Sequence, residues 1–247
     1  MFNPESTYRI QFNKAFNFEA FENILPYLQQ LGIKTIYASP IFKAVPGSMH
    51  GYDITDPLQI NPEIGTLEQL HKISARLKEL DISWIQDIVP NHMAFHQDNN
   101  WLMDVLMKGQ PSVYSSYFDI DWHHPLFKGK LILPILSKSL DETLKNKELS
   151  IVSNGQKFYL EYLDVNVPLN EAAAVSLTNT DLATLNKDRD KIKNIIDQQY
   201  YVPTVWSDTD KHINYRRFFT INGLISLNIQ NKNDFEKDKQ GNSLPYL

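Results

Sequence analysis

The chain has 247 residues, of which 42% are hydrophobic and 12% aromatic, so it can form a packed core and a disordered chain is excluded. Its formal charge of −5 is spread along the sequence, which argues against a nucleic-acid surface because such a surface needs a basic face. There is no cysteine for disulfides or thiolate metal sites, and no apolar run long enough for a signal peptide or a membrane span, so a cytoplasmic protein with no membrane partner is expected.

The first strand and helix are predicted from two different periodicities. Residues Thr7–Phe12 alternate in polarity, as a strand does. Helical spacing follows over the apolar residues Phe18, Phe21, Leu25, Leu28 and Leu31. Pro26 is expected to kink this helix or to start a new one. Gly32 is well placed to end it.

Two more strands and a second helix complete a regular series. Ile33–Ala38 is a β-branched stretch that predicts the second strand. Thr66 and Gln69 fit a capping box, which predicts the start of the second helix. Ile82–Val89 is almost continuously apolar, as in strands buried on both faces of a parallel sheet. Residues 1–90 therefore predict a parallel α/β fold of the strand–helix–strand type.

The alternation of strands and helices then breaks, and an inserted domain of mixed α+β structure is predicted over residues 91–213. It contains an expected hairpin, 149–152 with 157–162, around the turn signal Asn154–Gly155. A helix is expected near residues 181–199. Residues 214–247 are expected to return toward the first domain and to end in a tail without pattern from residue 236.

Two loops after predicted strands carry side chains suited to chemistry, which in parallel α/β folds collects at the carboxyl ends of the strands. The loop Ser39–Asp56 holds His50, Tyr52 and Asp53, with Gly51 permitting a turn. A tyrosine face can stack on a sugar ring, and the neighbouring histidine and aspartate can bind hydroxyls. The alternative is a turn with a packed tyrosine.

In the second loop, Asp87 lies at the carboxyl end of the buried strand, and Asn91 and His92 follow directly after Pro90. They could bind hydroxyls in a cleft, or they could be a satisfied polar cluster that closes a strand. One histidine with one carboxylate is not a ligand set, so no metal is assigned, and no cofactor is expected.

Several motifs together resemble glycoside hydrolase family 13, the α-amylase family, and within it the maltooligosyltrehalose synthases. The motifs HGYDITD at His50–Asp56 and DIVPNH at Asp87–His92 resemble the first signature regions of the family. The subgroup is indicated by the stretches Thr7–Gln11, Ser39–Ile41, Pro46–Asp53, Asn61–Gly65, Tyr117–Trp122, Leu133–Leu136 and Asn214–Phe219. Any one of these would be weak, whereas the set is specific.

The resemblance implies a TIM (β/α)8 barrel with a domain inserted after the third strand, of which this chain would hold the first three βα units. It implies that His50, Tyr52 and His92, and with less support Asp53, bind the substrate, and that Asp87 and Asn91 support the site. The reaction would turn the reducing-end α-1,4 link of a maltooligosaccharide into an α,α-1,1 link. It uses a nucleophilic and an acid/base carboxylate on later strands. Those strands have no counterpart here, so no catalytic residue is assigned and the chain alone is expected to be inactive.

Other functions remain open on the sequence. The chain could derive from another hydrolase or glucanotransferase of the family, or it could be a non-catalytic protein that binds α-glucan through aromatic side chains such as Trp101, Tyr117 and Trp122. Three parallel strands would leave sheet edges unpaired, so self-association or a complementing C-terminal fragment is also expected.

Overall fold

The computed structural model describes residues 4–208 and 213–229. The chain divides into two units, with the boundary between Ala94 and Phe95. The predicted tail from residue 236 lies outside the described residues.

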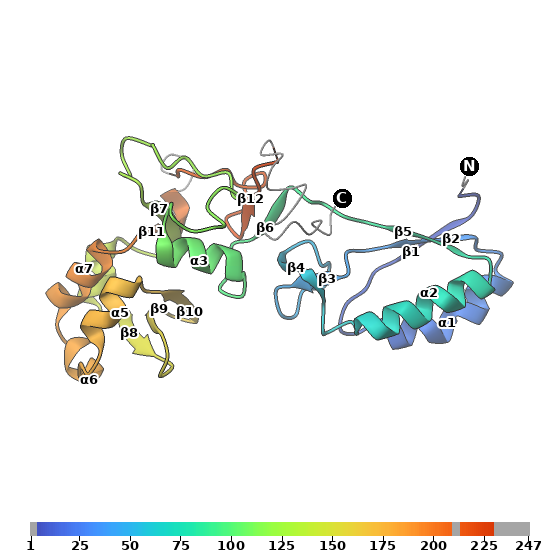
Figure 1. Ribbon diagram of the computed structural model, residues 1–247, viewed down its shortest axis with the longest axis horizontal. Coiled ribbons are helices and arrows are strands. Elements are labelled where there is room, and N and C mark those ends of the chain that lie inside the picture. The colour runs from blue at the N-terminus through green and yellow to red at the C-terminus, as the bar shows by residue number, and fades with distance from the viewer. Residues whose placement is uncertain (1–3, 209–212, 230–247) are drawn as a thin grey trace. The chain divides into compact units, whose positions relative to one another are not determined.

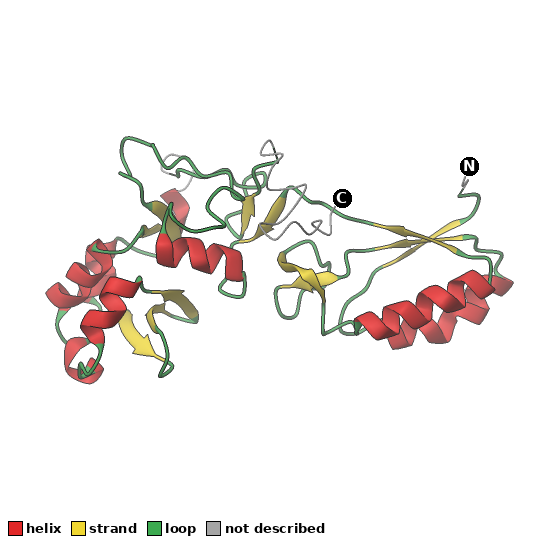
Figure 2. Cartoon of the chain, in the orientation of Figure 1, coloured by secondary structure: helices red, strands yellow, loops and turns green. Residues whose placement is uncertain are grey.

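A three-stranded parallel sheet organises the first unit (Figures 1 and 2). Its strands are β1 (Thr7–Ile10), β2 (Thr35–Ala38) and β5 (Ser83–Gln86), in the order β1-β2-β5. Helices α1 (Phe18–Gln30) and α2 (Leu67–Glu79) connect them and lie side by side along the sheet. This confirms the predicted alternation of strand and helix, while the described residues contain no closed barrel.

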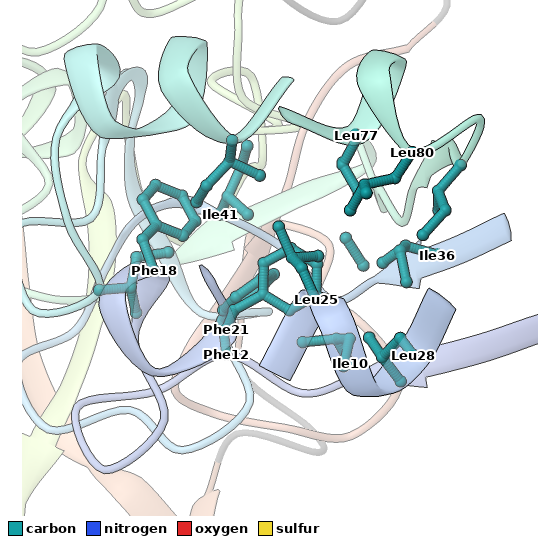
Figure 3. Close-up of a cluster of buried hydrophobic side chains, with 14 residues drawn as sticks. Ile10, Phe12, Phe18, Phe21, Leu25, Leu28, Ile36, Ile41, Leu77 and Leu80 are labelled. Carbon is teal, nitrogen blue, oxygen red and sulfur yellow. The ribbon is translucent and has the colours of Figure 1, made fainter. Parts of the chain in front are cut away.

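The core of this unit lies between the sheet and its two helices (Figure 3). Phe12 stands at its centre, with its ring edge-on to Phe18 at 5.2 Å and to Phe21 at 5.5 Å between centroids. Trp84 of β5 stacks on Phe12 at 5.9 Å. Side chains from both helices and all three strands or their ends complete the cluster, including Ile10, Leu25, Leu28, Ile36, Ile73, Leu77 and Ile82.

Both helices begin and end where local chemistry requires it. Asn17 caps α1 by accepting the Ala20 N–H, and Thr66 and Gln69 form the predicted capping box of α2. The expectation at Pro26 was wrong in one respect, because α1 runs through this residue without a fresh start. Pro26 lies on the exposed side of the helix, and the buried apolar side chains Phe18, Phe21, Leu25 and Leu28 hold the helix to the core on both sides of the proline.

A long connection joins β2 to α2. It contains the antiparallel pair β3 (Phe42–Ala44) and β4 (Ile54–Ile60), joined by the segment 45–53. The short strand β6 (His92–Ala94) follows β5 and closes the first unit along the chain.

The second unit is built from short strands and helices. Strands β8 (Leu149–Ser153), β9 (Phe158–Tyr162) and β10 (Val165–Pro168) form an antiparallel sheet, and β7 (Leu131–Leu136) pairs in parallel with β11 (Tyr201–Val205). The pairing of β8 with β9 confirms the hairpin predicted around Asn154–Gly155. The other elements are α3 (Asn100–Lys108), α4 (Leu140–Lys145), α5 (Glu171–Leu177), α6 (Leu182–Leu185), α7 (Arg189–Asp197), the 3-10 turn Trp206–Asp208 and β12 (Leu224–Ser226).

The single helix expected over residues 181–199 is instead two helices, α6 and α7. Asn186 interrupts it, because its side chain bonds both the N–H and the carbonyl of Ile151 on β8. Asp188 then starts α7 afresh by accepting the Lys191 N–H at 3.1 Å. Among the helices that the structure describes, each is too short or too polar to cross a membrane.

Candidate functional site

The carboxyl ends of the three parallel strands bring the polar residues of the first unit together. The Ile10 carbonyl accepts the Ser39 N–H, and the Ala38 carbonyl accepts the Asp87 N–H, both at 2.9 Å. The residues that directly follow β1, β2 and β5 therefore lie at one edge of the sheet. This is the edge at which parallel α/β proteins place functional groups.

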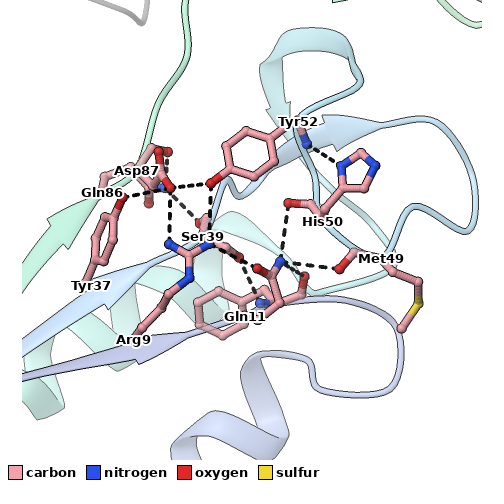
Figure 4. A network of polar contacts seen from close by, with 10 residues as sticks. Arg9, Gln11, Tyr37, Ser39, Met49, His50, Tyr52, Gln86 and Asp87 are labelled. Carbon is pink, nitrogen blue, oxygen red and sulfur yellow. Dashed lines mark hydrogen bonds and ion pairs between the residues drawn. The ribbon is translucent and has the colours of Figure 1, made fainter. Parts of the chain in front are cut away.

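Asp87 is the centre of a polar network at this edge (Figure 4). Its Oδ2 accepts hydrogen bonds from the hydroxyls of Tyr52 and Tyr37, the latter at 2.9 Å, and from Arg9 at 3.3 Å. The Asp87 side chain is only 11% exposed. Burial by itself would raise the pKa of this carboxyl, but the hydrogen bonds from Tyr52, Tyr37 and Arg9 outweigh burial and hold the pKa below its usual value. Asp87 is thus a partly buried, ionised acceptor that orients three donors.

Arg9 is the member of this network that the sequence reasoning missed. Its Nη2 donates to the Tyr52 hydroxyl at 3.3 Å and to Gln11 Oε1 at 3.1 Å, and the guanidinium lies 4.9 Å from the centre of the Tyr37 ring. The hydrogen bond with Tyr52 outweighs burial and raises the pKa of Arg9. The signal was present in the alternation of β1, which puts Arg9 and Gln11 on the face opposite Ile10. The register of β1 and β2 then pairs Arg9 with Tyr37.

Tyr52 joins the two predicted loops. Burial and the hydrogen bond to Asp87 raise the pKa of its hydroxyl. Its ring stacks on His50, with 6.0 Å between centroids and planes 25° apart. His50 Nδ1 accepts the Tyr52 N–H at 3.1 Å and lies 3.7 Å from Asp53 Oδ1, which in turn accepts the Ser48 hydroxyl. The His50 side chain remains 57% exposed, so its imidazole is available at the surface.

Gly51 shapes the turn that carries His50 and Tyr52. Its φ of +76° lies in the left-handed region, and an added Cβ would stand 2.9 Å from the Pro40 carbonyl oxygen. Both the backbone conformation and the close approach therefore require glycine here, as the sequence indicated for the turn.

His92 lies beneath this turn and is almost fully buried, at 2% exposure. Its Nε2 is 2.9 Å from the Tyr52 carbonyl oxygen and its Nδ1 is 2.8 Å from Asn91 Oδ1. Burial lowers the pKa of His92, against the smaller opposing effects of the Tyr52 carbonyl and the Asp53 charge. A neutral ring with its proton on Nε2 donates to Tyr52, and the Asn91 amide must then turn its NH2 toward Nδ1.

All six residues singled out in the sequence belong to the first unit, and contacts link them into one cluster. His50, Tyr52 and Asp53 form its outer part, while Asp87, Asn91 and His92 hold that part from below. The arrangement offers an exposed imidazole beside a phenol fixed by a carboxylate, groups that can bind hydroxyls. Within the described residues, no group of three or more histidine, aspartate or glutamate side chains is arranged to hold a metal ion.

Comparison with known proteins places the chain in a family. Residues 21–175 match the model of the α-amylase catalytic domain. The chain therefore belongs to the α-amylase family, whose catalytic domain is a TIM barrel. It is 35% identical over 145 residues to an α-amylase of Dictyoglomus thermophilum, covering 58% of this chain and 24% of that protein.

Similarity over most of the chain is found to maltooligosyl trehalose synthases. A putative maltooligosyl trehalose synthase of Mycobacterium tuberculosis H37Rv is 34% identical over 240 residues, or 94% of this chain. The solved structures of a glycosyltrehalose synthase and of the maltooligosyltrehalose synthase of Arthrobacter ramosus match 94% of the chain with TM-scores of 0.80 and 0.78, at 38% and 32% identity. The chain spans 28% of the length of the mycobacterial relative, 30% of the first structure and 28% of the second.

Proposed function

We propose that this chain forms part of a maltooligosyl trehalose synthase. The observation that carries the proposal is the match over 94% of the chain to solved synthases at TM-scores of 0.80 and 0.78. The reaction would convert the reducing-end α-1,4 link of a maltooligosaccharide into an α,α-1,1 trehalose link. Residues 1–90 would supply the first three βα units of the catalytic barrel, and residues 91–213 the domain inserted into it.

In this proposal the outer cluster binds the substrate. Tyr52 presents its ring to a glucose unit, and His50 and Asp53 serve its hydroxyls. His92 was also predicted to bind hydroxyls, but it is 2% exposed and both of its ring nitrogens are hydrogen-bonded within the cluster. The proposal therefore places His92 with Asp87 and Asn91 among the supporting residues. The network around Asp87 supports this assignment, because a phenol that is hydrogen-bonded to a partly buried carboxylate loses little further freedom when a sugar binds. The chain's own residues bind and orient the substrate. The carboxylates that carry out the chemistry lie, by the family resemblance, on later strands of the barrel.

The activity is tested with a chimeric enzyme. The matched region of a maltooligosyl trehalose synthase is replaced with this sequence, and the chimera is incubated with maltopentaose. Isomerisation is expected to lower the number of reducing ends while the chain length of the sugar is unchanged, and Tyr52→Ala should suppress this loss. A rise in reducing ends would instead support a hydrolase, an alternative that the match to an α-amylase over 145 residues keeps in view.

The binding cluster is tested on the 247-residue chain itself. Hydrogen exchange measured by mass spectrometry is expected to show protection by maltoheptaose in peptides covering residues 46–56 and 85–94. Tyr52→Ala should remove this protection. Tyr52→Phe should weaken it, because the ring remains but loses its hydrogen bond to Asp87. Unchanged exchange in both peptides with saturating sugar would overturn the assignment of these residues to the substrate.

A non-catalytic glucan-binding protein is less well supported. Two of the three aromatic residues considered for its sugar surface pack into the second unit instead. Trp101 stacks on Tyr114 at 5.5 Å and meets Tyr117 edge-on at 5.3 Å, and Tyr117 is buried. Both rings therefore pack within the unit, since Tyr114 covers one face of Trp101 and Tyr117 is buried.

A further inference from the structure

The second unit contains a polar pocket of about 580 Å³ that the proposed function does not use. It lies between α3, the end of the hairpin at β9 and strand β10, and α3 and β10 are in contact (Figure 1). Its polar lining includes Gln97, Asp98, Tyr114, Lys157, Tyr159 and Asn166. We propose that this pocket binds a glucosyl unit of an α-glucan. The choice of glucose rests on the proposed function, whereas the choice of a neutral, hydroxyl-rich ligand rests on the pocket itself.

The charges of the lining fit an uncharged ligand. Asp104 lines the pocket, but Lys108 neutralises its carboxylate, and the Ser112 hydroxyl donates to it at 2.6 Å. The remaining charged side chains, Asp98 and Lys157, are opposite in sign. A phosphate would need more cations than the single lysine that the described lining provides, and a divalent cation would need more free carboxylates. Amide, hydroxyl and mixed charged groups suit the hydroxyls of a sugar.

Two tyrosine side chains of the lining, Tyr114 and Tyr159, are fixed by neighbouring groups. Tyr114 lines the pocket, and Trp101, which does not, covers one face of its ring with the planes 7° apart. Tyr117 meets Tyr114 edge-on, at 5.6 Å between centroids. Tyr159, on β9, accepts a hydrogen bond from the Asn154 amide at 3.3 Å. Two fixed phenols can pack against the apolar face of a glucose unit at little cost in side-chain entropy.

Asn166 adds an acceptor that lacks a donor. Its backbone N–H donates to Gln97 Oε1 at 2.9 Å, but its side-chain Oδ1 is buried without a hydrogen-bond partner. Buried polar atoms are rarely left unpaired, because their desolvation is then uncompensated. Asn166 lines the pocket, and the χ2 torsion of an asparagine is broad, so its amide can rotate to offer this oxygen to a ligand. A hydroxyl of the ligand supplies the missing donor.

The experiment uses the 247-residue chain and maltoheptaose, with hydrogen exchange read by mass spectrometry because this readout tolerates self-association. Peptides covering residues 97–108 and 157–168 should be protected by the sugar. Asn166→Ala and Tyr159→Ala should each raise the sugar concentration needed for half protection roughly tenfold. The control is Asn194→Ala, the same substitution at an exposed position of α7. It should leave the sugar concentration for half protection unaltered.

The same data separate this proposal from the proposed function. Protection of residues 46–56 that is lost in Tyr52→Ala, without protection of residues 97–108 and 157–168, overturns the pocket and leaves the first site standing. Protection of the pocket peptides that survives Tyr52→Ala supports the pocket even if the first site does not bind. Protection that is equal in Asn166→Ala, Tyr159→Ala and the unaltered chain overturns the pocket assignment.

Discussion

At the scale of single residues, one carboxylate determines the geometry of the candidate site. Oδ2 of Asp87 accepts from three donors that come from β1, β2 and the loop after β3. Hydrogen bonds to a charged acceptor are stronger than neutral ones, and a buried donor that loses its partner incurs a desolvation cost. The exposed pair of Asp81 with Lys34 provides a natural comparison, because the Asp81 side chain is 91% exposed.

Asp87→Asn is expected to lower the free energy of unfolding by about 1–3 kcal/mol, since the amide cannot offer the charged oxygen to three donors. Asp81→Asn should cause a change too small to resolve. Urea unfolding followed by tryptophan fluorescence measures both. Equal effects of the two substitutions would show that the Asp87 network does not contribute to stability.

The burial of His92 predicts that the free energy of unfolding depends on pH. Burial lowers its pKa, so the ring stays neutral in the folded protein at pH values where an unfolded histidine, with a pKa near 6.5, takes up a proton. The unfolded state then binds more protons, and the stability contributed by His92 is present above about pH 6.5 and lost as the pH falls toward the folded pKa. Urea unfolding at pH values from about 7.5 to about 5.5, in steps of about one unit, should show this decrease. In His92→Gln the decrease should be shallower, and an identical slope would exclude His92 as its source.

At the scale of elements, two turn glycines with nearly equal positive φ angles differ in their surroundings. Gly32 follows α1 with φ +78°, and an added Cβ would meet nothing within 4 Å. Gly51 has φ +76°, but its added Cβ would meet the Pro40 carbonyl oxygen at 2.9 Å. An alanine would therefore incur the cost of a positive φ at both positions, but a steric clash only at Gly51.

Gly32→Ala is expected to destabilise the protein by about 1 kcal/mol, the cost of a left-handed conformation for a residue with a Cβ. Gly51→Ala should destabilise it more and should also weaken maltoheptaose binding, because the backbone of the turn carrying His50 and Tyr52 must shift. Thermal unfolding and calorimetric titration give the two quantities. A smaller loss of stability in Gly51→Ala than in Gly32→Ala would contradict the close approach at Pro40.

At the scale of the whole molecule, the described sheet of the first unit has two edges, β1 and β5. Unpaired strand edges offer backbone groups to other chains. The 247-residue chain is therefore expected to self-associate or to bind a complementing fragment, and sedimentation velocity at several concentrations would show a weight-average mass that rises with concentration. A stable monomer that unfolds in one cooperative transition would count against this prediction.

The sequence by itself determined the alternation of strands and helices in the first 90 residues, the capping box of α2 and the hairpin around Asn154–Gly155. Each of these depends on local periodicity or on a few neighbouring residues. It also pointed to His50, Tyr52, Asp53, Asp87, Asn91 and His92, because they follow strand ends in motifs that resemble one family. Tertiary structure alone decided that Arg9 and Tyr37 meet Asp87, since residues 78 and 50 positions apart are joined only by strand register. It likewise decided that α1 continues through Pro26 and that Asn186 divides α6 from α7, because packing and long-range hydrogen bonds override local signals.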